Sequence, residues 1–208
     1  MRETKIKTAV LISGGGTNLQ ALIRARNQDR LPDAELALVV SNRSDAYGLV
    51  RAKRAGIPTA VLTKKGCGGQ AGFEKSLLGL LEEQGIELIV LAGFLSILSA
   101  DFTRRYPRRI LNIHPSLIPS FCGAGFYGLK VHEAALEKGV KVTGATVHFV
   151  NEIPDGGQIL LQKAVKVQEG DTPEVLQKRV MRQAEWKLLP QAVAIVSKEM
   201  REKENGYL

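Results

Sequence analysis

Short apolar runs alternate with amphipathic segments through much of the chain, and this alternation is the feature that most constrains the fold. A parallel sheet whose strands are joined by crossover helices has this order of elements. The runs are continuous in Val, Ile, Leu and Ala instead of alternating with polar residues, which predicts strands covered by helices on both faces. The first five runs lie at 6–13, 34–42, 58–63, 86–93 and 108–114, with helical patterns at 17–27, 45–56, 73–85 and 129–139.

The pattern changes after residue 139. Residues 140–152 and 157–171 alternate apolar and polar side chains, which predicts two antiparallel or mixed strands added to the sheet. A last long helix begins at Pro173, with Asp171 or Thr172 as its N-cap, and we expect Pro190 to kink or restart it. The sequence therefore predicts an α/β fold with a mostly parallel, twisted sheet of about seven strands and helices on both faces.

Composition narrows the class of protein. With 208 residues, of which 44% are hydrophobic and 24% charged, the chain is expected to form one globular domain over 1–208. It contains no uncharged apolar run of about 20 residues, so we expect no membrane span. The start, "MRETKIKTAVLISGGG", is interpreted as a first strand and not as a signal peptide. Cys67 and Cys122 lack a CxxC spacing, which favours free thiols in a reducing cytoplasm.

The chain is basic, with 29 Lys and Arg against 21 Asp and Glu and a net charge of +8. Such a charge favours anionic ligands and raises the question of nucleic-acid binding. However, the basic residues are scattered over helical patterns, and only 5% of residues are aromatic and able to stack on bases. We therefore expect a solvated basic surface and no nucleic-acid partner.

A glycine loop, "LISGGGTNLQAL", joins the first predicted strand to the first predicted helix. Glycines allow a close approach of the backbone, and free N–H groups at a helix N-terminus bind anions, to which Thr17 and Asn18 add a hydroxyl and an amide. The loop matches neither the Walker A pattern nor GxGxxG. It predicts a cradle for a phosphate monoester, and the alternative is a tight turn with a purely structural role.

Polar residues at strand ends form a second candidate site. Asn112 and His114 are two residues apart and so point to the same side of one strand, while His148 lies on another strand and Asp155 in the turn after it. This set suits acyl transfer to an amine, because an imidazole, a carboxylate and an amide can stabilise an oxyanion and move protons. The alternative is a structural histidine beside a common turn sequence.

The same residues disfavour covalent and metal catalysis. No Ser or Cys lies in a GxSxG motif, and His114, His132 and His148 lack the spacing of zinc ligands. We therefore expect no metal.

Six blocks of sequence occur in order from about residue 7 to residue 192: "VLISGGGTNLQALI", "VVSNRSDAYGLVRAKRAGIPT", "IVLAGFLSILS", "ILNIHPSLIPSF", "GATVHFVNEIPDGGQILLQ" and "AEWKLLP". Together they resemble the phosphoribosylglycinamide formyltransferases, the folate-dependent enzymes of purine biosynthesis. The resemblance implies a Rossmann-like formyltransferase fold. It places binding of the ribonucleotide phosphate in the N-terminal half, about 1–100, and catalysis and folate binding in the C-terminal half, about 101–200.

The resemblance implies that the amine of glycinamide ribonucleotide attacks the formyl carbon of 10-formyltetrahydrofolate. The products would be the N-formyl ribonucleotide and tetrahydrofolate, in de novo purine (IMP) biosynthesis. Asn112 and His114 are implied as the polarising pair, and Asp155 as the carboxylate that raises the His114 pKa and helps to move protons. Protonated His114 and the Asn112 amide would then hold the oxyanion, while the acceptor of the amine proton stays open.

The resemblance also assigns two binding sites. Gly16, Thr17 and Asn18 match the phosphate loop, and Glu185, with Arg182 one helical turn earlier, matches the second side of the ribonucleotide site. The folate is expected to contact Gln70, Leu95, Ser96, Ile97, Leu98, Asn112 and Asp155.

Some positions depart from the family pattern. Ser96 stands where many relatives carry Arg, and Gln70 where some carry a basic residue against the folate tail. The segment "FCGAGFYGLKVHE", which contains Lys130 and His132 near its end, is longer than the shortest form of this loop in the family. The segment "KRVMRQAEWK" is one residue longer than the corresponding segment of some relatives.

Three alternatives accompany this assignment. A formyltetrahydrofolate hydrolase usually brings an extra N-terminal domain and a methionyl-tRNA formyltransferase an extra C-terminal one, and we expect neither in 208 residues. A catalytically silent ribonucleotide-binding module is disfavoured by Asn112, His114 and Asp155. We expect small-molecule substrates, no membrane partner, and a monomer or homodimer in the cytoplasm.

Overall fold

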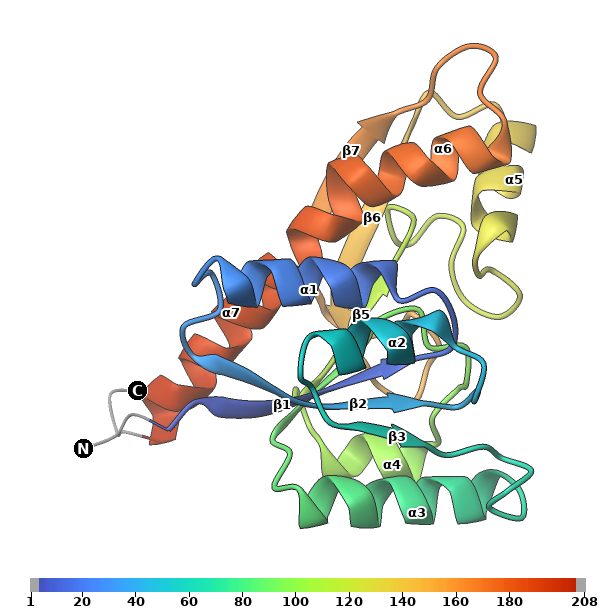
Figure 1. The fold of residues 1–208 in the computed structure, drawn as a ribbon. Coiled ribbons are helices and arrows are strands. Elements are labelled where there is room, and N and C mark those ends of the chain that lie inside the picture. Colours follow the sequence, from blue (N-terminus) through green and yellow to red (C-terminus); the bar gives the residue numbers. More distant parts are fainter. Residues whose placement is uncertain (1–3, 205–208) are drawn as a thin grey trace.

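The computed structural model describes residues 4–204 and is built on one seven-stranded sheet (Figure 1). The strands span Ile6–Ile12 (β1), Ala34–Ser41 (β2), Thr59–Val61 (β3), Leu88–Leu91 (β4), Ile110–His114 (β5), Val142–Phe149 (β6) and Ile159–Lys166 (β7). Their order is β3-β2-β1-β4-β5-β6-β7. β1 to β5 pair in parallel, whereas β6 and β7 are added antiparallel. This arrangement confirms the predicted mostly parallel α/β sheet.

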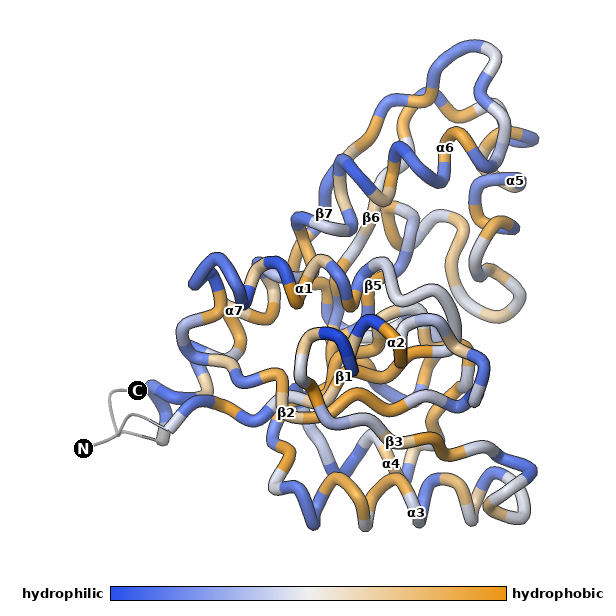
Figure 2. Tube along the Cα trace, in the orientation of Figure 1, coloured by the Kyte–Doolittle hydropathy of each residue, from blue (hydrophilic) through white to orange (hydrophobic). Residues whose placement is uncertain are grey.

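Helices cover both faces of the sheet, as the continuous apolar strands require. They span Thr17–Asn27 (α1), Tyr47–Arg54 (α2), Gln70–Glu83 (α3), Ala100–Arg105 (α4), Leu129–Glu137 (α5), Pro173–Val180 (α6), the π-helix Met181–Glu185 (η1) and Trp186–Glu204 (α7). Side chains of α1, α2, α6 and α7 form one core cluster with the sheet, and those of α3 and α4 form a second. Figure 2 shows β1 and β2 largely hydrophobic, whereas α3 and α6 alternate between hydrophobic and hydrophilic residues.

Local capping chemistry explains where several helices begin and end. Thr172, one of the two predicted caps, is the N-cap of α6 and accepts a hydrogen bond from Val175 N–H at 3.4 Å. Gly56 and Gly85 follow α2 and α3 with φ of 69° and 63°, which glycine adopts without strain. The sequence did not predict α4, because its six residues are too few to show a helical period.

The irregularity predicted at Pro190 lies about one turn earlier. Pro190 is inside α7, and the change of helix type is the π-helix η1, after which the α-helix restarts at Trp186. A proline cannot donate to the carbonyl four residues before it, here that of Trp186. That lost bond lies within α7 and does not account for η1, which ends at Glu185, so the prediction of a break at Pro190 was wrong in its position.

The loops that follow β1 and β4 meet at the middle of the sheet. These strands are parallel neighbours, but one loop leads to α1 on one face and the other to α4 on the opposite face. Open α/β sheets bind ligands beside such a switch point, at the carboxyl ends of the strands. The loops are tied together, because Ser13 N–H donates to Gly93 O at 3.1 Å and Leu95 N–H donates to Ser13 Oγ at 2.9 Å.

Candidate active site

The glycine loop between β1 and α1 is packed against α2. Gly16 has a φ of 68°, and a Cβ atom there would lie 2.6 Å from Gly48 Cα, so a larger residue would be strained and would clash. Gly48 N–H donates to Gly14 O at 3.0 Å. By contrast, a Cβ atom on Gly14 or Gly15 would have no protein atom within 4 Å. The fold therefore explains Gly16, whereas the first two glycines border open space next to the first turn of α1.

Asn18 and Glu185 meet at that first turn. Asn18 Nδ2 donates to Glu185 Oε2 at 2.7 Å, and the two residues are only 8% and 7% exposed. Glu185 is the last residue of η1, and a π-helix bonds over five residues where an α-helix bonds over four. This extra residue per turn agrees with the one-residue surplus noted in the sequence. The structure thus brings together the two sides that the resemblance assigned to one ribonucleotide site.

The ionisation of Glu185 should make stability depend on pH. Burial raises the pKa of Glu185 to about 7 from an ordinary value of 4.5, although the hydrogen bond from Asn18 lowers it. Between these values the folded state binds a proton that the unfolded chain has lost, so stability falls as the pH rises through about 7. We expect Glu185→Gln to remove this fall, which is worth at most about 3 kcal/mol. Thermal unfolding of both proteins at about pH 5 and pH 8 measures it, and an equal loss of Tm in both would contradict it.

Arg182 is not joined to this pair. It lies in η1, and its side chain makes no hydrogen bond or ion pair with any residue between 4 and 204. Its side chain lines a hollow on the surface of α6 and η1 together with Lys178 and Arg179. Its contact with a phosphate stays a prediction.

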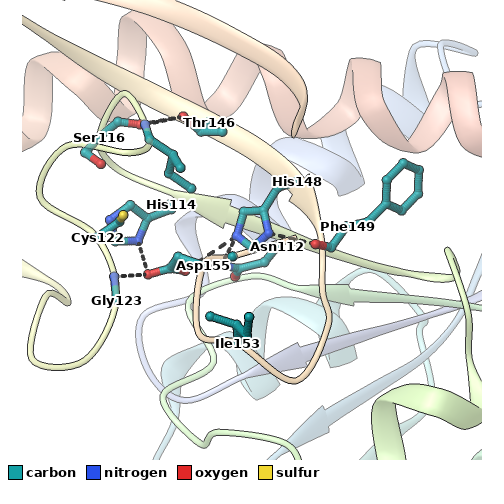
Figure 3. Close-up of polar contacts among 12 residues, drawn as sticks. Asn112, His114, Ser116, Cys122, Gly123, Thr146, His148, Phe149, Ile153 and Asp155 are labelled. Atoms are coloured by element: carbon teal, nitrogen blue, oxygen red, sulfur yellow. Dashed lines mark hydrogen bonds and ion pairs between the residues drawn. The ribbon is translucent and has the colours of Figure 1, made fainter. Parts of the chain in front are cut away.

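Four polar side chains, which we call the catalytic cluster, converge at the end of β5: Asn112, His114, His148 and Asp155 (Figure 3). Asn112 and His114 extend from β5, and His148 is the partner of Asn112 in the β5–β6 register. Asp155 lies in the turn after β6 with a φ of 56°. The tight turn "PDGG" turns the chain back toward β5, so the carboxylate reaches all three of the other side chains.

Asp155 is the centre of the catalytic cluster. Its Oδ2 lies 3.4 Å from His114 Nδ1 and accepts a hydrogen bond from Gly123 N–H at 2.9 Å. Its Oδ1 lies 3.5 Å from His148 Nε2 and accepts from Asn112 Nδ2 at 3.3 Å. Burial alone would raise the pKa of Asp155, but the hydrogen bonds and the neighbouring imidazoles outweigh it and lower that pKa. The carboxylate is therefore ionised at neutral pH.

His148 fixes the orientation of the Asn112 amide. Its Nδ1 lies 2.9 Å from Phe149 O, and since a carbonyl only accepts, Nδ1 carries the hydrogen. In the neutral ring Nε2 is then an acceptor, and it lies 3.1 Å from Asn112 Nδ2. The amide nitrogen of Asn112 thus donates to His148 and to Asp155. His148 was a sequence candidate without an assigned role, and the structure places it directly behind Asn112, 1% exposed.

The resemblance implied that Asp155 raises the pKa of His114, and the charge of Asp155 does act in this direction, but burial has the larger effect. Burial lowers the pKa of His114, and the raising effects of the Asp155 charge and of the Phe121 carbonyl do not compensate. Both ring nitrogens nevertheless face acceptors, because Nε2 lies 2.8 Å from Phe121 O and Nδ1 faces Asp155. The hydrogen bonds match the imidazolium, while the buried position favours the neutral ring.

Backbone groups of the loop after β5 complete the cluster, and the sequence did not predict them. Phe121 O and Gly123 N–H contact His114 and Asp155. The segment before them is held by Thr146, whose hydroxyl donates to Ser116 O at 2.7 Å. Thr146 is two residues before His148 on the same strand, so the two side chains point to the same side. This spacing could have identified Thr146 from the sequence. Backbone contacts of an irregular loop leave no such signal.

Lys130 and His132, the two candidates that follow this loop, differ in environment. His132, on α5, is fully buried, and neither ring nitrogen has a hydrogen-bond partner in the described structure. Burial lowers the pKa of His132 to about 4, with a further contribution from His114. Lys130 is exposed and donates to Tyr127 Oη at 3.3 Å. His132 is therefore neutral at physiological pH, and Lys130 belongs to the surface.

The segment predicted to bind folate, Leu95–Leu98, presents both apolar and polar groups. Leu95 and Ile97 are 59% and 63% exposed, which suits contact with a flat apolar ligand. Leu98 is buried in the second core cluster, so only its backbone can reach a ligand. Ser96 Oγ accepts from Asn42 Nδ2 at 2.9 Å, and Gln70 Nε2 donates to Ile97 O at 3.0 Å.

Residues 4–204 contain neither a group of metal-binding side chains nor a helix that could span a membrane. No three His, Cys, Asp or Glu side chains in this range are grouped so as to hold a metal ion. Among the same residues, no helix is both long and apolar enough to span a bilayer.

Comparison with known proteins places the chain in a family. The sequence profile of the formyl transferases matches residues 6–193. A phosphoribosylglycinamide formyltransferase of Haemophilus influenzae is 45% identical over 184 residues, which cover 88% of this chain and 84% of that protein. The trifunctional purine biosynthetic protein adenosine-3 of Gallus gallus is 49% identical over 199 residues, but the chain spans only 19% of its length.

Solved structures agree with this result. The crystal structure of glycinamide ribonucleotide transformylase 1 from Symbiobacterium toebii superposes with a TM-score of 0.88 at 40% identity, over 96% of this chain and 90% of that one. The profile match over residues 6–193 includes the glycine loop and the catalytic cluster. The chain therefore belongs to the formyl transferase family.

Proposed function

We propose that the protein transfers the formyl group of 10-formyltetrahydrofolate to the amine of glycinamide ribonucleotide, as a step of de novo purine biosynthesis. The names of its relatives in Haemophilus influenzae and Symbiobacterium toebii support formyl transfer to glycinamide ribonucleotide, and the folate donor is what the family resemblance implies. The observation that carries the proposal is the catalytic cluster, in which one partly buried, ionised carboxylate contacts Asn112, His114 and His148. Such a cluster can move protons and bind an oxyanion without a covalent nucleophile.

The reaction requires an oxyanion site. The lone pair of the amine forms a C–N bond to the formyl carbon, and the carbonyl electrons move to oxygen. The tetrahedral intermediate then collapses, the bond to N10 of the folate breaks, and N10 gains a proton while the attacking nitrogen loses one. Asn112 Nδ2 becomes available to the oxyanion when it gives up its longer hydrogen bond, the 3.3 Å contact with Asp155.

His114 provides the second donor. Its Nε2–H donates to Phe121 O in the free protein, so the formyl oxygen has to replace that carbonyl as acceptor. A negative charge growing at this point raises the pKa of His114, because an anion near an imidazole favours its charged form. Asp155 lies next to Nδ1 and can accept a hydrogen bond from the charged imidazolium. We assign the amine proton to Asp155, which would accept it directly or through a water molecule.

The glycine loop would hold the phosphate of the ribonucleotide. Thr17 begins α1, an eleven-residue helix, and the free N–H groups of its first turn suit an anion. Gly14 and Gly15 leave the adjoining space empty, as an approaching phosphate requires. Buried Glu185, paired with Asn18, borders the same turn and offers an acceptor to hydroxyl or amine groups.

Filling this space should weaken ribonucleotide binding without loss of stability. We expect Gly14→Val to raise the KM for glycinamide ribonucleotide about tenfold or more, because the new side chain occupies the predicted phosphate position. The matched control is Gly79→Val, which adds the same side chain in α3, also with no atom within 4 Å of its Cβ. Steady-state kinetics and Tm measure both. An unchanged KM in Gly14→Val would return the loop to a structural role.

A direct assay tests the proposed reaction. The purified protein is mixed with glycinamide ribonucleotide and 10-formyltetrahydrofolate, and mass spectrometry detects the ribonucleotide with one added formyl group. Absence of this product would refute the proposal. Release of formate without the ribonucleotide would favour the hydrolase alternative.

The remaining expectations belong to this proposal. A reaction by proton transfer and oxyanion binding involves no metal, and both substrates are small anionic molecules, which agrees with the net charge of +8. A cytoplasmic location, a monomer or homodimer, and no nucleic-acid or membrane partner stay predictions. The division into an N-terminal phosphate half and a C-terminal catalytic half also stays a prediction. It is not strict, because Glu185 is in the C-terminal half but would serve the phosphate site, and Leu95–Leu98 are in the N-terminal half but would serve the folate site.

A further inference from the structure

A buried carboxylate outside the catalytic cluster has no cationic partner in the described structure. Glu74 is in α3 and is 8% exposed, on the same side as the core residues Phe73, Leu77 and Leu81. Among residues 4–204 it forms no ion pair with a Lys, Arg or His. A charge in such a position is costly unless hydrogen bonds compensate it, so its partners indicate what it is for.

Among residues 4–204, two residues donate all of the hydrogen bonds that the Glu74 carboxylate accepts. Oε1 accepts from Gln70 Nε2 at 2.5 Å and from Ser99 N–H at 2.7 Å, and Oε2 accepts from Ser99 Oγ at 2.5 Å. Ser99 Oγ in turn accepts from Phe102 N–H at 3.2 Å as the N-cap of α4. Glu74 thus joins α3 to the point where the segment after β4 enters α4.

That segment contains Leu95–Leu98, and it is held at both ends. Ser13 binds its first part, since Leu95 N–H donates to Ser13 Oγ at 2.9 Å. Glu74 binds its last residue, Ser99, through two hydrogen bonds. Gln70 adds a third attachment, because Nε2 also donates to Ile97 O at 3.0 Å. Between these attachments Leu95 and Ile97 remain exposed, so the segment presents apolar side chains from a backbone fixed by its ends.

We propose that Glu74 is a positioning residue for the folate site, which holds the backbone of Leu95–Leu98 in the shape that receives the pterin ring. This inference rests on the proposed function. A ligand that hydrogen-bonds to backbone groups needs them in place before it arrives, because ordering a mobile segment on binding costs affinity. Glu74 does not touch the reacting atoms, so its effect falls on folate binding.

The same contacts redefine Gln70. The sequence suggested that Gln70 faces the folate tail, yet its amide nitrogen donates to Glu74 and to Ile97 O. An amide NH₂ group has two hydrogens, and both are used within the protein. Gln70 therefore acts with Glu74 on the segment, and it has no donor left for a carboxylate of the tail.

Substitution of Glu74 separates positioning from catalysis. We expect Glu74→Ala to raise the KM for 10-formyltetrahydrofolate about tenfold or more, with kcat within about threefold of wild type and an unchanged KM for glycinamide ribonucleotide. The Kd for tetrahydrofolate, measured by titration calorimetry, should rise by the same factor. Glu74→Gln keeps one acceptor oxygen for Gln70 and Ser99 N–H, so it should lie between wild type and Glu74→Ala.

The control is Glu83→Ala, an exposed position on the same helix, which should leave all constants unchanged. Hydrogen exchange adds a direct readout, because the amide of Ser99 should lose protection in Glu74→Ala. Two results for Glu74→Ala would overturn the inference: an unchanged KM and Kd for the folate, or a parallel rise of the KM values for both substrates together with a lower Tm. If Glu74→Ala does not fold, the same measurements on Glu74→Gln and Gln70→Ala decide it. A wild-type protein that forms no formylated ribonucleotide would instead refute the proposed function.

Discussion

Replacement of His114 by alanine should lower kcat about a hundredfold or more, with little change in the KM for glycinamide ribonucleotide. The imidazole is 5% exposed and is the only group of the cluster placed to donate from Nε2 while Nδ1 faces a carboxylate. Without it the oxyanion keeps only the donor from Asn112. The loss should appear in kcat because the ring acts on the transition state and not on the ribonucleotide phosphate.

Single-turnover kinetics with saturating substrates measure this loss, and ribonucleotide binding with Tm serves as the check on folding. A His114→Ala protein that turns over within a few-fold of wild type would remove His114 from the mechanism. So would a large rise in the KM for the ribonucleotide with normal kcat, because that result would make the imidazole a binding group.

Replacement of Asp155 by asparagine should have an effect of similar size, about a hundredfold or more in kcat. The amide matches the carboxylate in shape, but one oxygen becomes an NH₂ group that faces a donor, either Gly123 N–H or Asn112 Nδ2. Loss of the negative charge also removes the attraction that raises the pKa of His114. The transition state then loses both the proton acceptor and the charge that stabilises the imidazolium.

The pH dependence distinguishes this role from a structural one. Since Asp155 raises the pKa of His114 against burial, Asp155→Asn should move the titration of His114 to lower pH, which NMR of the imidazole detects. The control is Asp101→Asn, an exposed carboxylate paired with Arg104, which should change neither kcat nor the titration. An unchanged His114 titration, or kcat near wild type, would contradict the assigned role of Asp155.

Much of the fold could be predicted because its signals are local. Apolar runs and helical periods marked all seven strands and every helix longer than eight residues, apart from the position of the break near Pro190. The two-residue spacing of Asn112 and His114 likewise predicted a shared direction, since side chains alternate along a strand. The glycine loop was recognisable because only glycine tolerates the conformation and contact found at Gly16.

The sequence by itself determined the order of the elements, the strand that carries Asn112 and His114, and the residue types of the site. Only the tertiary structure decided the rest: Asn18 meets Glu185, 167 positions away, His148 orients Asn112, and Glu74 holds Ser99. It also decided the pKa of His114, which burial lowers although a carboxylate is near. The physical reason is that propensity and periodicity act between neighbours in the chain, whereas burial and hydrogen-bond partners depend on distances that exist only after folding.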